Sequence, residues 1–306
     1  MTSYVLTLIG NSESAPLEPV HIDRVLQCLE MPAETDWLAE REAADLFISS
    51  RLSTESITEK ARDALSGDAI DVVCTGLEGR RKKLLISDMD STIINQECID
   101  ELADAIGIGS QIREITASVM RGDISFPEAL RKRIGLMKGM DIKTLESVYE
   151  QRITLKTGAR TLIQTMRHHG AYCILVSGGF TYFTSRIAAR LGFHDHKGNE
   201  LIFDQGKLTG EVQDQILGRS AKLDTLMALC DEKDLTPSDV LAVGDGANDI
   251  KMIQAAGLGV AFHNHNGSLR NQSTARIEYA DLTALLYIQG FRKSEFVLSS
   301  GDTILN

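Results

Sequence analysis

The first 80 residues alternate short apolar runs with segments of helical periodicity. Short runs of apolar or alternating residues predict strands, and apolar residues that recur every third or fourth position predict helices. The pattern gives, in order, strand Tyr4–Ile9, helix His21–Leu29, strands Trp37–Glu40 and Ala44–Ser49, helix Thr54–Leu65 and strand Ile70–Cys74. This βαββαβ order is that of a ferredoxin-like α+β domain, and we expect residues 1–80 to form one.

A different pattern follows the basic run Arg80–Lys83 and predicts a doubly wound α/β domain with a parallel sheet over residues 81–306. Its short, almost wholly apolar strands are typical of a sheet covered on both faces; they are Leu84–Ser87, Tyr172–Ser177, Val240–Gly244 and Leu258–Ala261. Helices such as Ala159–His168 and Ser220–Cys230 fall between them. The long helical stretch Glu97–Tyr149 predicts a helical cap, at about residues 97–155, inserted after the first of these strands.

Composition narrows the classes of partner and the compartment. The net charge of -11 and the pI near 5.2 argue against a nucleic-acid surface. No run of about 18 apolar residues suggests a membrane span, and Met1–Asn11 lacks the basic and apolar segments of a secretion signal. The five dispersed cysteines show no metal-finger spacing, which indicates reduced thiols and a cytoplasmic protein.

Polar residues follow three of the predicted core strands directly. Asp88 and Asp90 follow the first strand, Ser177-Gly178-Gly179 ends the second, and the third runs into Gly244-Asp245-Gly246-Ala247-Asn248-Asp249. In an open parallel sheet, ligands bind outside the carboxyl ends of the strands. Residues far apart in the sequence are therefore expected to meet at one edge of the sheet.

The residue types at this edge suit phosphoryl transfer. The carboxylates of Asp88, Asp90 and Asp245 would repel one another unless a hard cation neutralised them, and oxygen ligands suit Mg²⁺. Ser177, the Gly178 amide and Lys222 offer donors for phosphate oxygens. An aspartate can attack phosphorus and form an aspartyl-phosphate, which divides one difficult step into two.

The same residues resemble the motifs of the haloacid dehalogenase superfamily. Asp88-Met89-Asp90-Ser91-Thr92 is similar to its DxDxT motif, and Ser177, Lys222 and the run Gly244–Asp249 are similar to its other three motifs, in the same order. The chain resembles the phosphoserine phosphatase branch of this superfamily more closely. This resemblance rests on Glu97, which directly precedes Cys98-Ile99-Asp100-Glu101, and on Met120, Phe126 and Arg133 in the cap. It covers roughly Leu84–Tyr287, and residues 1–80 resemble ACT domains in pattern alone.

The resemblance implies a magnesium-dependent hydrolysis of O-phospho-L-serine, the last step of L-serine biosynthesis. Asp88 would be the nucleophile and Asp90 the general acid and base. Mg²⁺ would be held by Asp88, the Asp90 backbone carbonyl and Asp245, with Asp249 and Asn248 supporting the metal and phosphate environment. Ser177, Gly178 and Lys222 would hold the phosphoryl group.

The cap residues would recognise the amino-acid part of the substrate. Arg133 would bind the carboxylate and Glu97 the ammonium, and Met120 and Phe126 would supply apolar walls. An amino-acid effector at the N-terminal domain and a homodimer are two further partners that the resemblance allows, whereas nucleic acid and membrane are not expected.

Other readings stay open at this point. The acidic residues and glycines are common in turns, the charges of Glu97 and Arg133 could be solvated, and Met120 and Phe126 could be core of the cap. His263 and His265 lack an evident third metal ligand. After His263 the branch commonly continues Ala-Lys-Pro, where this chain has Asn264-His265-Asn266-Gly267. Rival functions are hydrolysis of another small phosphate ester, phosphoryl transfer to an alcohol such as homoserine, and a non-catalytic amino-acid sensor.

Overall fold

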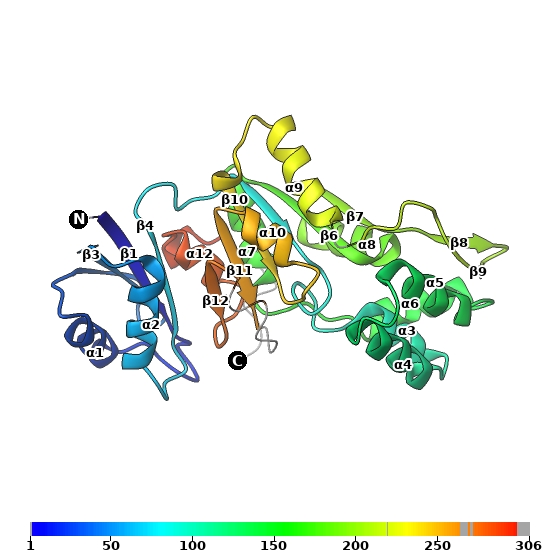
Figure 1. Cartoon of the computed structure of the whole chain (residues 1–306), viewed down its shortest axis with the longest axis horizontal. Helices are drawn as coiled ribbons and strands as arrows, with labels where there is room; N and C mark the ends of the chain where they lie inside the picture. Colours follow the sequence, from blue (N-terminus) through cyan, green and yellow to red (C-terminus); the bar gives the residue numbers. More distant parts are fainter. Residues whose placement is uncertain (1, 219, 264–268, 270–271, 299–306) are drawn as a thin grey trace.

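The computed structural model describes residues 2–218, 220–263, 269 and 272–298, apart from the side chain of Met120. The chain is elongated, with an N-terminal antiparallel sheet at one end, a parallel sheet in the middle and a group of helices at the other end (Figure 1). This arrangement confirms the predicted fold class, an α/β core with a helical insertion and a ferredoxin-like α+β domain before it.

The N-terminal sheet has the order β2-β3-β1-β4 with antiparallel neighbours, and two helices cover one of its faces. Its elements are β1 (Thr2–Ile9), α1 (Pro19–Leu29), β2 (Glu34–Ala39), β3 (Ala43–Ser50), α2 (Thr54–Ala64) and β4 (Asp71–Gly76). Leu6, Leu8 and Leu46 point to the helix side and pack with Val25 and Ile57 into one buried cluster. Strand alternation explains this division, since successive side chains point to opposite faces.

The opposite face of the N-terminal sheet packs on the rest of the chain. Ile9, Ala43 and Val73 belong to the same buried cluster as Leu285 and Tyr287 of α12 (Ala284–Ile288). The N-terminal sheet is therefore covered on both faces, by its own helices on one side and by α12 on the other.

Two buried polar contacts fix this junction. The Asp71 carboxylate accepts hydrogen bonds from the backbone amides of Glu278, Tyr279 and Ala280 at 2.8–3.1 Å. Arg80, in the segment between the two sheets, forms an ion pair with the buried Asp45 at 2.7 Å. Such paired groups satisfy the hydrogen-bonding needs of polar atoms that burial removes from water.

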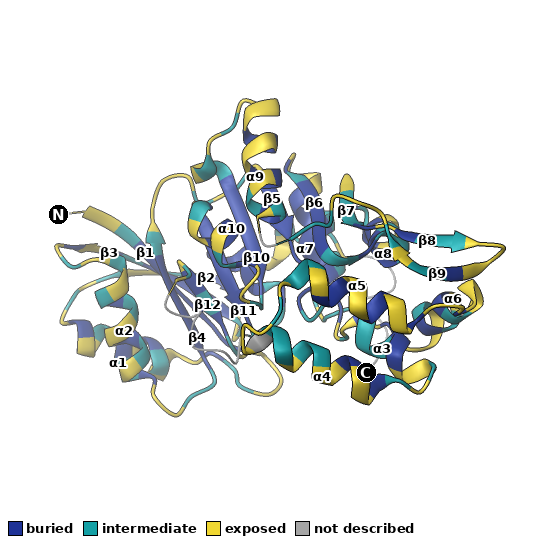
Figure 2. Cartoon of the chain, turned by 45° about the vertical axis from the view of Figure 1, so that its right-hand side comes forward, coloured by how far each residue is buried: buried dark blue, intermediate teal, exposed yellow. Residues whose placement is uncertain are grey.

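The parallel sheet has six strands in the order β12-β11-β10-β5-β6-β7. These are β5 (Leu84–Ser87), β6 (Tyr172–Phe180), β7 (Asp195–Asn199), β10 (Val240–Gly244), β11 (Leu258–Phe262) and β12 (Ala275–Ile277). The four predicted strands occupy the middle of this order, and β7 and β12 lie at its two edges. The central strands are dark blue in Figure 2 because they are buried on both faces.

Helices cover both faces of the parallel sheet, as a doubly wound fold requires. Among the described residues they are α7 (Ala159–His168), α8 (Thr181–Leu191), α9 (Ala221–Glu232), α10 (Ile250–Ala255) and α12, with 3₁₀ turns at Pro237–Asp239 and Lys293–Glu295. One buried cluster lies on the side of α9 and α10 and another on the side of α7 and α12. None of the helices in the described ranges is long and apolar enough to cross a lipid bilayer.

The cap is formed by α3 (Cys98–Ala105), α4 (Gly109–Met120), α5 (Phe126–Leu136) and α6 (Ile142–Gln151). It has one component that the sequence pattern did not predict, the hairpin of β8 (Leu201–Asp204) and β9 (Lys207–Val212), which comes from a later part of the chain. The Gly139 amide donates to the Leu208 carbonyl at 2.7 Å, so the hairpin is bonded to the segment after α5. The cap is thus tied to the core through two separate parts of the sequence.

Candidate active site

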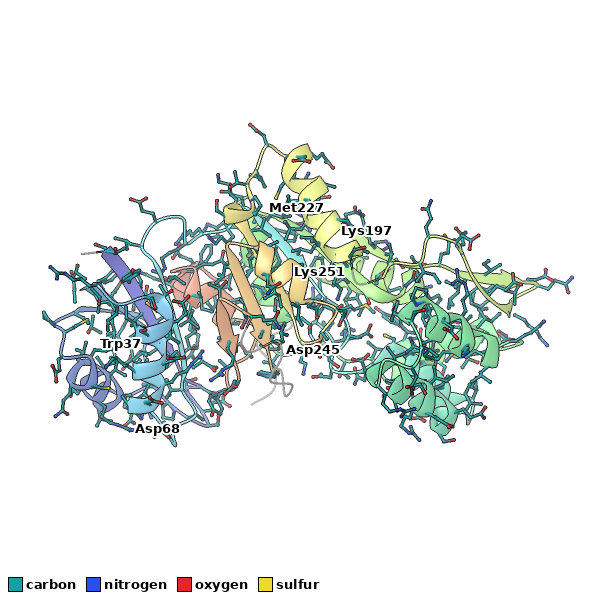
Figure 3. The ribbon with its side chains drawn as sticks, viewed as in Figure 1. Trp37, Asp68, Lys197, Met227, Asp245 and Lys251 are labelled. Atoms are coloured by element: carbon teal, nitrogen blue, oxygen red, sulfur yellow. The ribbon has the colours of Figure 1, made fainter. Side chains whose placement is uncertain are left out.

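The central position of β5 brings three loops together at one edge of the sheet. β5 pairs in parallel with β10 on one side and with β6 on the other, so the carboxyl ends of all three strands meet. The Asp88 amide continues this pairing by donating to the Val243 carbonyl at 3.0 Å. In Figure 3 the labelled Asp245 lies in the region between the core strands and the helical cap.

Asp88 and Lys222 form a buried ion pair at this edge. The Lys222 ammonium lies 2.8 Å from Asp88 Oδ1 and 2.5 Å from Asp249 Oδ1, and all three residues are at most 5 % exposed. The Met89 amide also donates to Asp88 Oδ1, at 2.7 Å. One oxygen of the Asp88 carboxylate is therefore held by two donors. Within the described ranges no donor binds Oδ2, which leaves that oxygen available to a ligand.

Three carboxylates form a group that fits a divalent cation. Oxygens of Asp88, Asp245 and Asp249 all lie within 4.8 Å of one another. Thr92 donates to Asp245 Oδ1 at 3.1 Å, and the Gly246 amide donates to Asp249 Oδ2 at 3.0 Å. Lys222 supplies one positive charge against three carboxylates, so the donor set has the hard oxygens and the excess negative charge that such a cation needs.

Two of these acids, Asp245 and Asp249, have raised pKa values. Burial, with the nearby Asp88 charge second, raises the pKa of Asp245 to about 6 and that of Asp249 to about 7. Burial disfavours the charge on Lys222, but the Asp249 and Asp88 carboxylates outweigh it and hold the pKa of this lysine above its usual range. The lysine therefore stays charged, while the acids beside it remain short of positive charge.

Asp90 faces a different direction from this group of three. Its Oδ1 accepts the Cys98 amide at 2.9 Å, and its Oδ2 accepts the Ser177 hydroxyl at 3.1 Å. Burial is the largest cause that raises the pKa of Asp90, to about 6. The hydrogen bond from the Cys98 amide lowers this pKa, and the nearby Asp88 charge raises it. The Asp90 side chain is thus fixed between the cap helix α3 and the carboxyl end of β6, beside the nucleophile candidate but outside the metal cluster.

The end of β6 that contains Ser177 and Gly178 runs close to the cap. A Cβ atom on Gly178 would lie 3.2 Å from the ring of Phe126, the first residue of α5. On the other side of β5, a Cβ on Gly244 would lie 2.3 Å from Asp249 Cγ. Both glycines allow side chains of the site to approach the backbone closely.

Glu97 and Arg133 face the site from the cap. The Ser91 hydroxyl donates to Glu97 Oε1 at 2.7 Å, and Ser91 itself has a positive φ of 56°, which turns the chain after the Asp90 position. Burial of the carboxylate, with the Asp90 charge second, raises the pKa of Glu97, although the residue keeps an exposed side. Arg133 is 8 % exposed, and its guanidinium lies 5.9 Å from the centre of the Phe126 ring.

Arg133 has no acidic partner among the described residues. Its Nε makes one 3.4 Å contact with the Ala129 carbonyl, and no carboxylate oxygen in that part of the chain lies within 4.0 Å of its nitrogens. Burial lowers the pKa of Arg133, and the more distant charges of Asp100 and Glu97 oppose this. A buried guanidinium without a paired anion is suited to a ligand carboxylate.

The other predicted site residues are less closely placed. Asn248 is exposed, on the loop between β10 and α10. A Cβ atom added to Gly246 would lie 2.3 Å from its Oδ1. Met120 ends α4, but its side chain lies outside the described residues, as do Asn264, His265, Asn266 and Gly267. His263 bonds the Ala280 carbonyl at 2.9 Å and stacks on Phe262, so it has a packing role.

Three supporting contacts were missed by the sequence reasoning. Thr92 holds Asp245, and as the last residue of the DxDxT pattern it carried a signal that was left unused. The Cys98 amide and the Asn199 side chain had no such signal, because a backbone donor and a lone asparagine in a polar stretch leave no pattern in the sequence. Asn199 donates to the Gly178 carbonyl at 2.8 Å.

Comparison with known proteins agrees with this arrangement of motifs. The sequence model of the haloacid dehalogenase-like hydrolases matches residues 85–254. The chain belongs to this family.

Its relatives define the branch more narrowly. A protein named phosphoserine phosphatase from Polaromonas sp. is 40% identical over 225 residues, which are 72% of this chain and 95% of that protein. A phosphoserine phosphatase from Archaeoglobus fulgidus is 41% identical over 206 residues, or 67% of this chain, and the match spans 59% of the length of that protein. A solved structure described as a phospho-aspartyl intermediate analogue of phosphoserine phosphatase superposes with a TM-score of 0.62 at 37% identity, covering 68% of this chain and 98% of that one.

Proposed function

We propose that this chain hydrolyses O-phospho-L-serine to L-serine and phosphate through an aspartyl-phosphate on Asp88. The observation that carries the proposal is the Asp88 carboxylate, with one oxygen held by Lys222 and Met89 and the other open beside Asp245 and Asp249. The names of the relatives and the phospho-aspartyl analogue support the same substrate and the same kind of intermediate.

In the first step, an Asp88 oxygen forms a bond to phosphorus while the bond from phosphorus to the serine oxygen breaks. Lys222 and Ser177 bind oxygens of the transferring group and so keep it in line with Asp88, together with the Gly178 amide. The Lys222 ammonium also contacts the attacking carboxylate, at 2.8 Å from Asp88 Oδ1. Asp249 orients Lys222 in turn.

Asp90 moves the protons of both steps. Its raised pKa lets the carboxyl hold a proton that it gives to the leaving serine oxygen. As a carboxylate, it then accepts a proton from the water that attacks phosphorus and releases Asp88. The Cys98 amide orients Asp90 for this exchange.

The cation proposed for the acidic group is Mg²⁺, held by the Asp88 and Asp245 carboxylates and the Asp90 backbone carbonyl, with Asp249 and Asn248 supporting it. When bound, it would supply positive charge to the phosphoryl oxygens. Hard oxygen donors and a substrate phosphate are the environment that Mg²⁺ prefers. Thr92 keeps Asp245 turned toward this position by its hydrogen bond.

The cap supplies specificity for a small zwitterion. Arg133 has a buried guanidinium without a described acidic partner and would pair with the substrate carboxylate. Glu97, whose pKa is raised by burial and then by the neighbouring Asp90 charge, would accept the substrate ammonium. Phe126 and Met120 would form apolar walls that exclude water from the site.

The wider setting of the reaction is also part of the proposal. We assign residues 1–80 to an ACT-like domain and 81–306 to the phosphatase core, with the cap at about 97–155. The domain over residues 1–80 would be the place for an amino-acid effector or for contact with a second copy of the chain. L-serine as product fits the last step of L-serine biosynthesis, and the free cysteines fit a reducing cytoplasm.

A phosphate-release assay tests the proposed substrate. Phosphoserine, phosphothreonine and an aryl phosphate would be compared with Mg²⁺ present and with EDTA added. We expect phosphoserine to give the highest kcat/KM and EDTA to abolish release from all three compounds. Equal rates on the three compounds would refute the assignment to phosphoserine.

The rival functions give different results in the same assay. A hydrolase of another small phosphate ester would release phosphate fastest from a compound other than phosphoserine. A phosphotransferase would form a new phosphoester when homoserine or another alcohol is added, whereas a hydrolase would release phosphate alone. A non-catalytic sensor would release no phosphate under any condition. The intact set of Asp88, Lys222, Asp245 and Asp249 favours hydrolysis over the sensor.

A further inference from the structure

Asn199, the last residue of β7, joins two segments of the active site through the nitrogen and the oxygen of its side-chain amide. Its Nδ2 donates to the Gly178 carbonyl at 2.8 Å, and its Oδ1 accepts from the Leu217 amide at 2.8 Å. The residue is 3 % exposed, and its backbone pairs with Phe180 of β6. The orientation of the amide is fixed by chemistry, since a carbonyl needs a donor and an N–H group needs an acceptor.

We propose that Asn199 is a positioning residue that sets both the end of β6, from Ser177 to Gly179, and the start of the helix that carries Lys222. It does not touch the reacting atoms itself. Its effect on the reaction passes through the two backbone groups that it binds.

The first arm acts through a single peptide unit. In a planar trans peptide, the carbonyl of one residue and the amide of the next point in opposite directions. When Asn199 fixes the Gly178 carbonyl, it therefore also fixes the direction of the Gly179 amide. That amide donates to Ser177 Oγ at 2.8 Å, and Ser177 in turn donates to Asp90 Oδ2 at 3.1 Å.

The second arm acts on the segment that leads into α9. Leu217 lies a few residues before Lys222, the second residue of α9. Its amide is held by Asn199, which limits where that helix can begin. Lys222 must reach Asp88 at 2.8 Å and Asp249 at 2.5 Å from this position.

The two hydrogen bonds require a side chain of this length with one donor and one acceptor. Aspartate keeps the acceptor for Leu217 but presents an oxygen to the Gly178 carbonyl, where a donor is needed. A shorter side chain leaves at least one of two buried backbone groups without a partner, which costs free energy. Substitution should therefore displace Ser177 and Lys222, both of which contact the phosphoryl group in the proposed mechanism.

The full-length Asn199→Asp variant tests this inference against a matched control, Gln289→Glu. Gln289 is also buried, at 1 % exposure, and its amide also joins two backbone groups, the Lys82 amide at 2.9 Å and the Leu285 carbonyl at 2.7 Å. It directly follows α12, away from the acidic group. Both variants exchange a buried amide for a carboxyl, so both should lose stability.

We expect Asn199→Asp to lower kcat by about 10- to 100-fold, the usual effect of displacing groups around a reacting centre. The loss should be equal for phosphoserine and for an aryl phosphate, and inhibition by inorganic phosphate should weaken in parallel. Activity should recover partly at acid pH, because the buried carboxyl becomes protonated there and can again donate to Gly178. Gln289→Glu should lower the melting temperature and keep kcat within about twofold.

Several outcomes would overturn the inference. One is a near-normal kcat in Asn199→Asp, and another is an equal loss of kcat in Gln289→Glu, which would indicate general destabilisation. If Asn199→Asp does not fold, Asn199→Ser replaces it, with the same expected loss of kcat and phosphate affinity. The inference rests on the proposed phosphatase function, but the aryl phosphate readings remain valid if phosphoserine proves not to be the substrate.

Discussion

Replacing Arg133 by alanine separates recognition of the substrate from the chemistry at phosphorus. The guanidinium is buried, lies near the Phe126 ring and has no acidic partner within the described ranges. In the proposed complex it forms a two-bond fork with the carboxylate of phosphoserine. Each hydrogen bond between charged groups contributes about 1.5–3 kcal/mol, so the fork contributes roughly 4 kcal/mol.

This free energy should appear as a loss of kcat/KM for one substrate only. At 1.4 kcal/mol per factor of ten, Arg133→Ala should lower kcat/KM for phosphoserine by roughly a thousandfold. An aryl phosphate has no carboxylate to lose, so its kcat/KM should change by less than about tenfold, through the packing that Arg133 supplies. The ratio between the two substrates therefore reports the fork and cancels any general effect of the mutation.

Two further variants sharpen the assay. Arg131 lies on the same helix, with an exposed side chain that forms a 3.8 Å ion pair with Asp214, and Arg131→Ala should leave kcat/KM for both substrates unchanged. Arg133→Lys keeps the charge without the planar fork and should give an intermediate loss on phosphoserine. An equal loss on phosphoserine and the aryl phosphate in Arg133→Ala would refute the assignment of Arg133 to the carboxylate.

Three other perturbations follow from the same contacts. Asp88→Asn should abolish turnover while the melting temperature stays near that of the wild type; measurable turnover would remove Asp88 as nucleophile. Thr92→Val deletes the hydrogen bond to Asp245 and should raise the Mg²⁺ concentration needed for half-maximal rate by about 10-fold or more; an unchanged metal titration would contradict that role. Asp71→Ala leaves the backbone amides of Glu278, Tyr279 and Ala280 without their buried acceptor and should cost about 3 kcal/mol in unfolding free energy with kcat preserved; denaturant unfolding measures it, the exposed Asp63→Ala is the control, and equal stability of the two variants would contradict the role of Asp71.

The middle of the parallel sheet was predictable from the sequence because its strands are short, almost wholly apolar runs. β5 matches its predicted bounds, Leu84–Ser87, and β10 its bounds, Val240–Gly244. The edge strand β7 was missed, since Asp195-His196-Lys197-Gly198-Asn199 has the composition of a loop. An edge strand is paired on one side only and needs no continuous apolar run. The hairpin β8–β9 was also missed, although two runs that flank the turn Gln205-Gly206 carry a hairpin pattern.

The candidate site was predictable as far as it depends on motifs. Asp88, Asp245 and Lys222 come together because they follow or begin elements of the sheet, and this placement needs only the strand order. The direction in which each carboxylate points was not predictable. Asp249 joins Asp88 and Asp245 in the cluster, whereas the Asp90 side chain turns to Ser177 and Cys98. Those orientations depend on single hydrogen bonds from the Gly246 amide, the Cys98 amide and Ser177.

The central claim is that Asp88 carries the phosphoryl group during turnover. The most direct measurement is to mix the enzyme with phosphoserine and Mg²⁺, quench in acid within the first turnover, and examine the peptides by mass spectrometry. We predict the mass of one phosphoryl group on the peptide that contains Asp88, lost on treatment with hydroxylamine and never formed in Asp88→Asn. A phosphoryl group on another residue, or rapid turnover by Asp88→Asn, would contradict the account.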